Sequence, residues 1–162
     1  MKKRLLRKIR KQYDYSYQPK FNYMKYVRTI RTYIQKKHEI NINELELLLY
    51  MYDEDLFTKN QIINDFRGFF NIGSAAFKRM VSREFIMFWR NYGYGVGSTY
   101  TISPLGKRIV KEFYGKLHGD EIFSEKDLNN ENFKASPMYS NAYLLMIKKM
   151  SEEIKESRIR KR

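Results

Sequence analysis

Apolar side chains recur every three or four residues through most of the chain, which is the period of an α-helix. This spacing predicts a first helix from Phe21 to about Lys37, after an irregular stretch that ends at Pro19. A second helix is predicted to begin near Asn43, because Asn43 and Glu46 resemble a capping box. Its many leucines indicate a place at the centre of the core, and the acidic residues 53–55 end it.

Two short helices separated by a glycine-containing turn are predicted in the middle of the chain. The first begins at Thr58, which resembles the start of a capping box, and Gly68 closes it. Residues 69–73 form the turn, and Ser74 then caps a helix that runs from Ala75 to about Phe85. This pair has the pattern of a helix-turn-helix.

The hydrophobic period changes to two after these helices. Residues Ile86–Asn91 and Ser98–Ile102 are predicted to be two strands around a glycine-rich turn, which makes a β-hairpin. The glycines lack the spacing of a phosphate-binding loop and no helix follows them directly, so the pattern does not predict a nucleotide site. We expect Trp89 to lie in the core rather than to stack on bases.

Two Ser-Pro pairs predict the last two helices, because serine is a good N-cap and proline fits the first helical position. The helix after Ser103-Pro104 is predicted to run to about His118, where a glycine ends it. Residues 120–135 are polar and are predicted to form a loop. The last helix is predicted to start at Ser136-Pro137 and to reach about Ser157.

The last helix carries an apolar stripe along one face. Its residues recur at helical spacing, and they are Tyr143, Ile147, Met150 and Ile154. Such a stripe must be covered by another element. It can pack on the first helix of the same chain or pair with its copy in a second subunit.

The composition excludes several kinds of site. The chain has 162 residues and no cysteine, so disulfides, thiolate zinc sites and cysteine nucleophiles are absent. Its two histidines, His38 and His118, are far apart and belong to no ligand motif. The acidic groups at residues 53–55 and 152–153 have no nucleophile or metal-ligand spacing beside them. We therefore expect no catalytic residues, no metal and no cofactor, and a protein that is not an enzyme.

The positive charge is concentrated at one end of the chain. The net charge is +14, and residues 1–37 carry 13 lysines and arginines against one acidic residue. Such a block attracts polyanions, with nucleic acid as the first candidate and an anionic membrane surface as the second. Tyrosine and phenylalanine side chains alternate with the charges at residues 13–26, which is unusual for a tail that serves only solubility.

The chain contains no apolar run of membrane-spanning length and no signal peptide, so we expect no membrane association and a cytoplasmic, nucleoid-associated protein. Its richness in lysine, asparagine, isoleucine, tyrosine and phenylalanine favours an AT-rich genome, such as that of a phage or mobile element.

Two segments resemble the MarR family of winged-helix transcription regulators. Phe77–Val81 is similar to the recognition-helix pattern of that family, and Tyr100–Ile109 is similar to the segment in which the second wing strand enters a helix. The order of the predicted elements between residues 21 and 157 matches as well. The chain departs from the family at Arg83–Trp89, which lacks the usual glycine, and at Gly93–Gly97, which replaces the usual wing-tip sequence.

The resemblance implies a mainly α fold with a small β-hairpin: a winged helix-turn-helix domain with N- and C-terminal helices for dimerisation. It divides the chain into a basic arm at residues 1–20, the domain at 21–157 and a basic tail at 158–162. It further implies a homodimer that reads double-stranded DNA at half-sites about one helical turn apart. Members of the family often bind small aromatic anions, but no residue pattern here specifies an effector.

Three groups of residues are predicted to contact DNA. A recognition helix needs an apolar face on the core and hydrogen-bond donors on the opposite face. The opposite face here comprises Ala75, Arg79, Ser82 and Arg83, with Lys78 at its margin, and Ser74 at the helix start is expected to hold a phosphate. Those expected in the hairpin are Arg90, Asn91 and Ser98. Those expected in the arm are Lys2, Lys3, Arg4, Arg7, Lys8, Arg10 and Lys11, and removal of the arm should weaken binding at every sequence and flatten its salt dependence.

The alternative to a sequence-specific regulator is a protein that binds nucleic acid without sequence preference. Architectural, replication or partition, and particle-assembly proteins belong to this class. The long basic arm and the aromatic content of 16% are more typical of this alternative than of a standard regulator.

Overall fold

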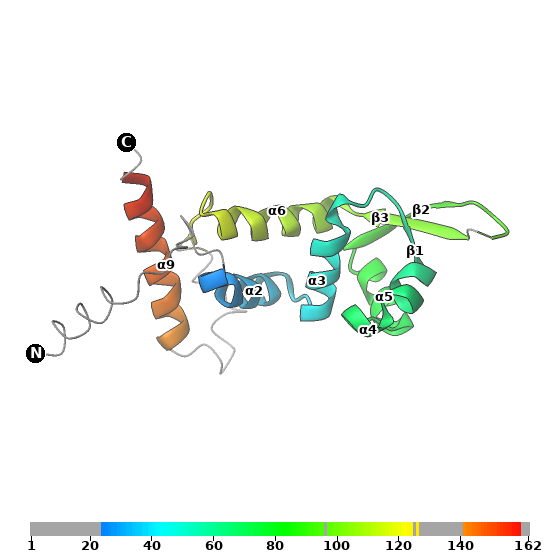
Figure 1. Ribbon diagram of the computed structural model, residues 1–162, viewed down its shortest axis with the longest axis horizontal. Helices are drawn as coiled ribbons and strands as arrows, with labels where there is room; N and C mark the ends of the chain where they lie inside the picture. The colour runs from blue at the N-terminus through cyan, green and yellow to red at the C-terminus, as the bar shows by residue number, and fades with distance from the viewer. Residues whose placement is uncertain (1–23, 96, 125, 127–140, 160–162) are drawn as a thin grey trace, which may run out of the picture.

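The computed structural model describes residues 24–95, 97–124, 126 and 141–159 (Figure 1). The predicted basic arm, the start of the predicted first helix, the Ser136-Pro137 helix start and the end of the basic tail lie outside these residues. Within them, no helix is both long enough and apolar enough to cross a membrane.

The described chain is mainly helical and carries a small three-stranded antiparallel sheet. The strands lie in the order β1–β3–β2, so β3 is central and β2 is an edge strand. This organisation is compatible with the winged-helix arrangement expected from the sequence. In chain order the elements are α2 (Met24–His38), α3 (Ile42–Tyr50), the 3-10 turn η1 (Met51–Asp53), β1 (Phe57–Thr58), the π-helical turn η2 (Gln61–Asp65), α4 (Arg67–Phe70), α5 (Ser74–Ser82), β2 (Ile86–Asn91), β3 (Ser98–Ile102), α6 (Pro104–His118) and α9 (Asn141–Ile159).

The hairpin and α6 are confirmed at the residues that the sequence predicts. The N-cap of α6 is Ser103, whose hydroxyl accepts the N–H of Gly106, and Pro104 is its first residue. Gly119 ends the helix in the left-handed conformation that favours glycine, with φ at 79°. These boundaries follow from local chemistry, which explains why the sequence alone predicts them.

The predicted start of the second helix is wrong by two residues. The capping box consists of Asn41 and Glu44, not Asn43 and Glu46. The Asn41 side chain accepts the N–H of Asn43, and the Glu44 carboxylate accepts the N–H of Asn41 at 2.9 Å. Both pairs have the required spacing, and the Asn41 register also places Leu45 and Leu48 in the core.

The predicted third helix is also corrected. The box between Thr58 and Gln61 is present, but Phe57 and Thr58 form β1, and the helix after them is split into η2 and α4. Gly68 lies inside α4, and the chain turns at Asn71 instead, with φ at 50°. Asparagine tolerates this left-handed conformation better than most residues, so the turn does not need a glycine.

The limits of α5 differ from the prediction at both ends. Gly73 is its N-cap, in extended conformation, and Ser74 is its first helical residue rather than its cap. The helix ends at Ser82, because Glu84 takes a left-handed conformation with φ at 58°. This turn directs Phe85 and Ile86 back into the core and starts β2.

The core is formed where α2 lies against α6, with α3 between them and the sheet (Figure 1). The helix α9 packs against α2 at the end of the molecule away from the hairpin, and the predicted stripe of Ile147, Met150 and Ile154 is buried there. The hydroxyl of Tyr143 donates to the carbonyl of Thr29 at 2.5 Å, and Lys25 pairs with Glu153 at 2.7 Å. The stripe is thus covered within one chain.

A buried lysine stabilises the packing of α6 on α2. The side chain of Lys116 is 3% exposed, and its ammonium lies 5.0 Å from the centre of the Tyr33 ring and 4.7 Å from that of Phe123. Cation–π contacts of this kind offset part of the cost of burying a charge. The carboxylate of Glu112 lies 3.8 Å from the same ammonium.

Glu112 connects the end of α2 to α6. Lys37 donates to one of its carboxylate oxygens at 2.7 Å, and Nε2 of His38 lies 2.9 Å from the other. Burial alone would raise the pKa of Glu112, but the hydrogen bonds from His38 and Lys37 outweigh burial and lower this pKa below its ordinary value of 4.5.

We expect Glu112→Gln to remove part of the acid sensitivity of folding. A carboxyl whose pKa is lowered in the folded state adds stability that is complete above its ordinary pKa of 4.5 and is lost as the pH falls below 4.5 and through the lowered pKa of the folded state. The free-energy gap between the wild type and the variant should therefore shrink from pH 7 to pH 3. Urea unfolding at several pH values measures it, and a gap that stays constant contradicts the prediction.

Candidate nucleic-acid interface

One face of α5 is turned to solvent. The buried side of this helix carries Phe77 and Met80, with Ala76 and Val81 partly buried beside them. The six residues of this helix that the sequence assigns to DNA contact are all exposed, and they are Ser74, Ala75, Lys78, Arg79, Ser82 and Arg83. The helical spacing therefore predicts the orientation of this helix correctly.

Arg79 is held by a carboxylate of the core. Its Nε donates to Glu44 at 2.8 Å, and its terminal NH2 group lies 2.6 Å from the same oxygen. The Glu44 side chain is 2% exposed, whereas that of Arg79 is 49% exposed. Because Glu44 also belongs to the capping box of α3, this ion pair fixes α5 against the start of α3.

Arg83 is held in a similar way at the other end of α5. Its guanidinium donates to the carbonyl of Glu39 at 2.8 Å and to the Glu39 carboxylate at 2.7 Å. Glu39 lies in the connection between α2 and α3, with φ at 49°. Two of the three basic side chains on this face are thus bound to carboxylates of the same chain.

Lys78 differs from these two arginines. It is exposed near the middle of α5, and it forms no ion pair within the part of the chain that the structure describes. The small residues Ser74 and Ala75 lie one turn before it, so the start of α5 can approach a ligand closely. An anion would meet a lysine and small polar groups on this face, rather than three unpaired cations.

The hairpin positions of the predicted interface are also accessible. Arg90 is exposed, and its guanidinium lies 5.5 Å from the centre of the Tyr92 ring. Asn91 uses its side chain to accept the N–H of Gly93, which stabilises the turn. Ser98 is half-buried at the start of β3. The third group, in the basic arm, lies outside the described residues.

The expectation that Trp89 lies in the core is wrong. Its side chain is 55% exposed, and a bulge interrupts the pairing of β2 and β3 between Phe88 and Arg90. After Ile86, every residue of β2 is exposed. The large exposed apolar side chains of this hairpin are Met87, Phe88, Trp89, Tyr92 and Tyr94.

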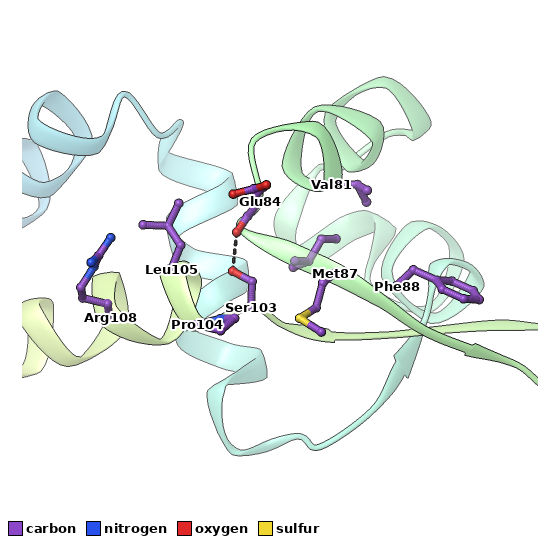
Figure 2. A pocket seen from close by; sticks show the side chains of 9 residues that line it. Val81, Glu84, Met87, Phe88, Ser103, Pro104, Leu105 and Arg108 are labelled. Atoms are coloured by element: carbon purple, nitrogen blue, oxygen red, sulfur yellow. Dashed lines mark hydrogen bonds between the residues drawn. The ribbon is translucent and has the colours of Figure 1, made fainter.

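A pocket of about 530 Å³ opens at the base of the hairpin, between the end of α5, the start of β2 and the start of α6 (Figure 2). Its wall is mostly apolar, with Glu84 and Arg108 as its charged members. The hydroxyl of Ser103 donates to the backbone carbonyl of Glu84 there. In sequence order, the side chains around the pocket are Val81, Glu84, Ile86, Met87, Phe88, Ser103, Pro104, Leu105 and Arg108.

No sequence pattern predicts the two carboxylates that hold the arginines of α5. Glu44 and Arg79 are 35 residues apart, and Glu39 and Arg83 are 44 apart, so no local pattern links them. The alternative capping box at Asn41 and Glu44 is the one local signal that draws attention to Glu44. Among the described residues, no cluster of histidine, aspartate and glutamate could hold a metal ion.

Comparison with known proteins gives no relative. No family model matches the chain, and no curated protein or solved structure resembles it significantly.

Proposed function

We propose that the protein binds double-stranded DNA through a winged helix-turn-helix in which α5 enters the major groove. The observation that carries this proposal is the exposed face of α5, which presents Lys78 behind the small residues Ser74 and Ala75. The hairpin follows α5 in the chain and its strand β2 packs against α5, which supports the proposal that the hairpin is a wing. The resemblance of Phe77–Val81 and Tyr100–Ile109 to MarR-type regulators supports the same proposal.

The charge of the chain supplies the attraction. A net charge of +14, concentrated in residues 1–37, favours contact with phosphates over a broad surface. In this proposal the arm and Lys78 bind the DNA backbone, and Ser74 and Ser82 donate or accept at the edge of the groove. The hairpin, in which Arg90 is the single charged residue, contributes little to phosphate binding in this proposal.

We expect Lys78→Ala to weaken binding to a duplex about tenfold at physiological salt. If Lys78 contacts a phosphate, the slope of log K against log salt should fall by about 0.9. Fluorescence anisotropy over a salt series measures both quantities. The matched control is Lys155→Ala, which removes the same charge from an exposed site on α9, far from α5 (Figure 1). Equal losses in the two variants would contradict a role for α5.

Binding without sequence preference is the second candidate function, and one observation favours it. Arginine is the residue that reads guanine best, and both arginines of α5 are bound to carboxylates of the protein itself. Selection of bound duplexes from a random pool separates the two candidates. An enriched motif indicates a specific regulator, whereas salt-sensitive binding without enrichment indicates an architectural or assembly protein.

A further inference from the structure

The hairpin has the surface of a protein interface rather than that of a phosphate-binding wing. Between Ile86 and Ile102 the sequence holds one charged residue, Arg90, in a chain whose charged content is 31%. Its other exposed residues are methionine, phenylalanine, tryptophan, tyrosine, asparagine and glycine. Protein interfaces are enriched in aromatic residues, methionine and arginine, and they are depleted in lysine, aspartate and glutamate.

The backbone of β2 is available for pairing as well. This strand is at the edge of the sheet and pairs with β3 on one side alone. Edge strands are ordinarily protected by lysine, proline, inward-pointing charges or bulges. β2 has no lysine or proline, and its bulge follows Phe88, so the stretch from Ile86 to Phe88 is regular and open to pairing. Its bulge at Trp89 turns one large side chain away from the regular alternation.

The pocket in Figure 2 lies against the edge of this strand. Three consecutive residues of β2, Ile86, Met87 and Phe88, line it. Alternate residues of a strand point to opposite faces, so a pocket lined by consecutive residues lies beside the edge rather than on one face. The pocket and the hairpin tip, with the fully exposed Tyr94, are therefore at opposite ends of the same edge.

We propose that two copies of this chain associate by antiparallel pairing of their β2 edges, so that the tyrosine tip of each hairpin covers the pocket of the other. A twofold axis beside Met87 generates this arrangement, because antiparallel pairing about it brings the end of one β2 to the beginning of the other and residue 90 of each copy opposite residue 84 of its partner. The tip supplies Tyr92 and Tyr94, and the pocket supplies an apolar wall of about 530 Å³.

Charge complementarity identifies a second copy as the occupant. Antiparallel pairing carries Arg90 of each copy toward Glu84 of the other, and Glu84 is exposed without an ion pair in the described part of the chain. At +14, two copies repel each other over most of their surface. The hairpin, with its single charge, is a place where they can approach, and the Glu84–Arg90 pair forms twice.

The exposed area is adequate for a weak dimer. Aromatic side chains bury 150–250 Å² each, and five large side chains here are between 39% and fully exposed. These side chains offer on the order of 500 Å² of accessible surface per copy for burial, and the strand backbone adds to this area. A standard interface buries about 800 Å² per partner. The stripe of α9, for which the sequence left both an intramolecular contact and a dimer contact open, is already covered by α2.

Sedimentation velocity without nucleic acid tests the dimer, so its outcome is independent of DNA binding. We expect the full chain to be a monomer–dimer mixture at about 50 μM, as for a weak interface, and Trp89→Lys to raise the dissociation constant at least tenfold. Phe69→Lys is the matched control, since Phe69 is a 74% exposed side chain on α4. Thermal melting of each variant shows whether it is folded.

A charge reversal keeps the proposal falsifiable if Trp89→Lys unfolds the chain. Glu84→Arg and Arg90→Glu should each weaken the dimer, and the double variant should restore it. A monomer throughout the concentration range overturns the proposal. So does a dimer that resists both Trp89→Lys and the single charge reversals but is broken by Leu145→Lys on the exposed side of α9.

Discussion

Gly106→Ala is expected to destabilise the protein by about 3 kcal/mol, at the upper end of the cost of overpacking a core. A Cβ at this position would stand 2.3 Å from the carbonyl oxygen of Phe85 and 2.7 Å from a methyl group of Ile102. The Phe85 carbonyl cannot move away easily, because it accepts the backbone N–H of Ser103 and lies 3.1 Å from the hydroxyl oxygen of the same residue. The substitution therefore forces α6 away from the start of β2.

Gly115→Ala is the matched control for this prediction. Gly115 lies in the same helix, and the nearest neighbour of its added Cβ would be the flexible side chain of Glu121, at 3.0 Å. Because alanine favours the helix over glycine by about 1 kcal/mol, this variant should be as stable as the wild type or slightly more stable. Urea unfolding measures both variants, and equal midpoints would show that the contact at Gly106 relaxes without cost.

The same contact explains why the sequence predicts this part of the fold so well. Ser103 caps α6, and Gly106 allows its first turn to lie directly against the carbonyl of Phe85. The four consecutive residues Ser-Pro-Leu-Gly therefore determine how β3 connects to α6, and they can be recognised in the sequence. Caps, glycine turns and apolar spacing act over a few residues, and for this reason the hairpin, α6 and the orientation of α5 could be predicted.

The remaining features depend on residues that are distant in the sequence. β1 is two residues long and exists through its pairing with β3, with Phe57 opposite Tyr100. Trp89 is exposed because β2 is an edge strand with a bulge, and strand order is not contained in a local apolar pattern. A large aromatic residue such as Trp89 is ordinarily expected in the core. Its exposure here follows from the position of β2 at the edge of the sheet.

Arg79 is the residue of the candidate site whose contacts in the structure differ most from the role that the sequence predicts. Its residue type and its place on the exposed face of α5 predict a base-reading arginine. Its contacts are those of a residue that positions the helix, since two of its three guanidinium nitrogens are bound to a carboxylate in the core. Loss of a base-reading arginine should leave the free energy of unfolding almost unchanged, whereas loss of an arginine that positions α5 should lower it.

Arg79→Ala is expected to reduce the free energy of unfolding by about 2–3 kcal/mol. The substitution leaves the Glu44 carboxylate buried with the N–H of Asn41 as its remaining partner in the described contacts, and a buried charge without its counter-ion is costly. We place the cost below that of a fully buried pair, because half of the Arg79 side chain is in water. Urea unfolding without DNA gives the value directly.

A second substitution distinguishes the buried charge from the loss of packing. Adding Glu44→Gln to Arg79→Ala removes the uncompensated charge but keeps an oxygen to accept the N–H of Asn41, so the double variant should regain about half of the lost stability. Lys78→Ala, one residue away and without an ion pair, should change stability by less than about 0.5 kcal/mol. If Arg79→Ala were as stable as Lys78→Ala while binding DNA more weakly, Arg79 would be a DNA contact after all, and α5 would owe its orientation to Phe77 and Met80 alone.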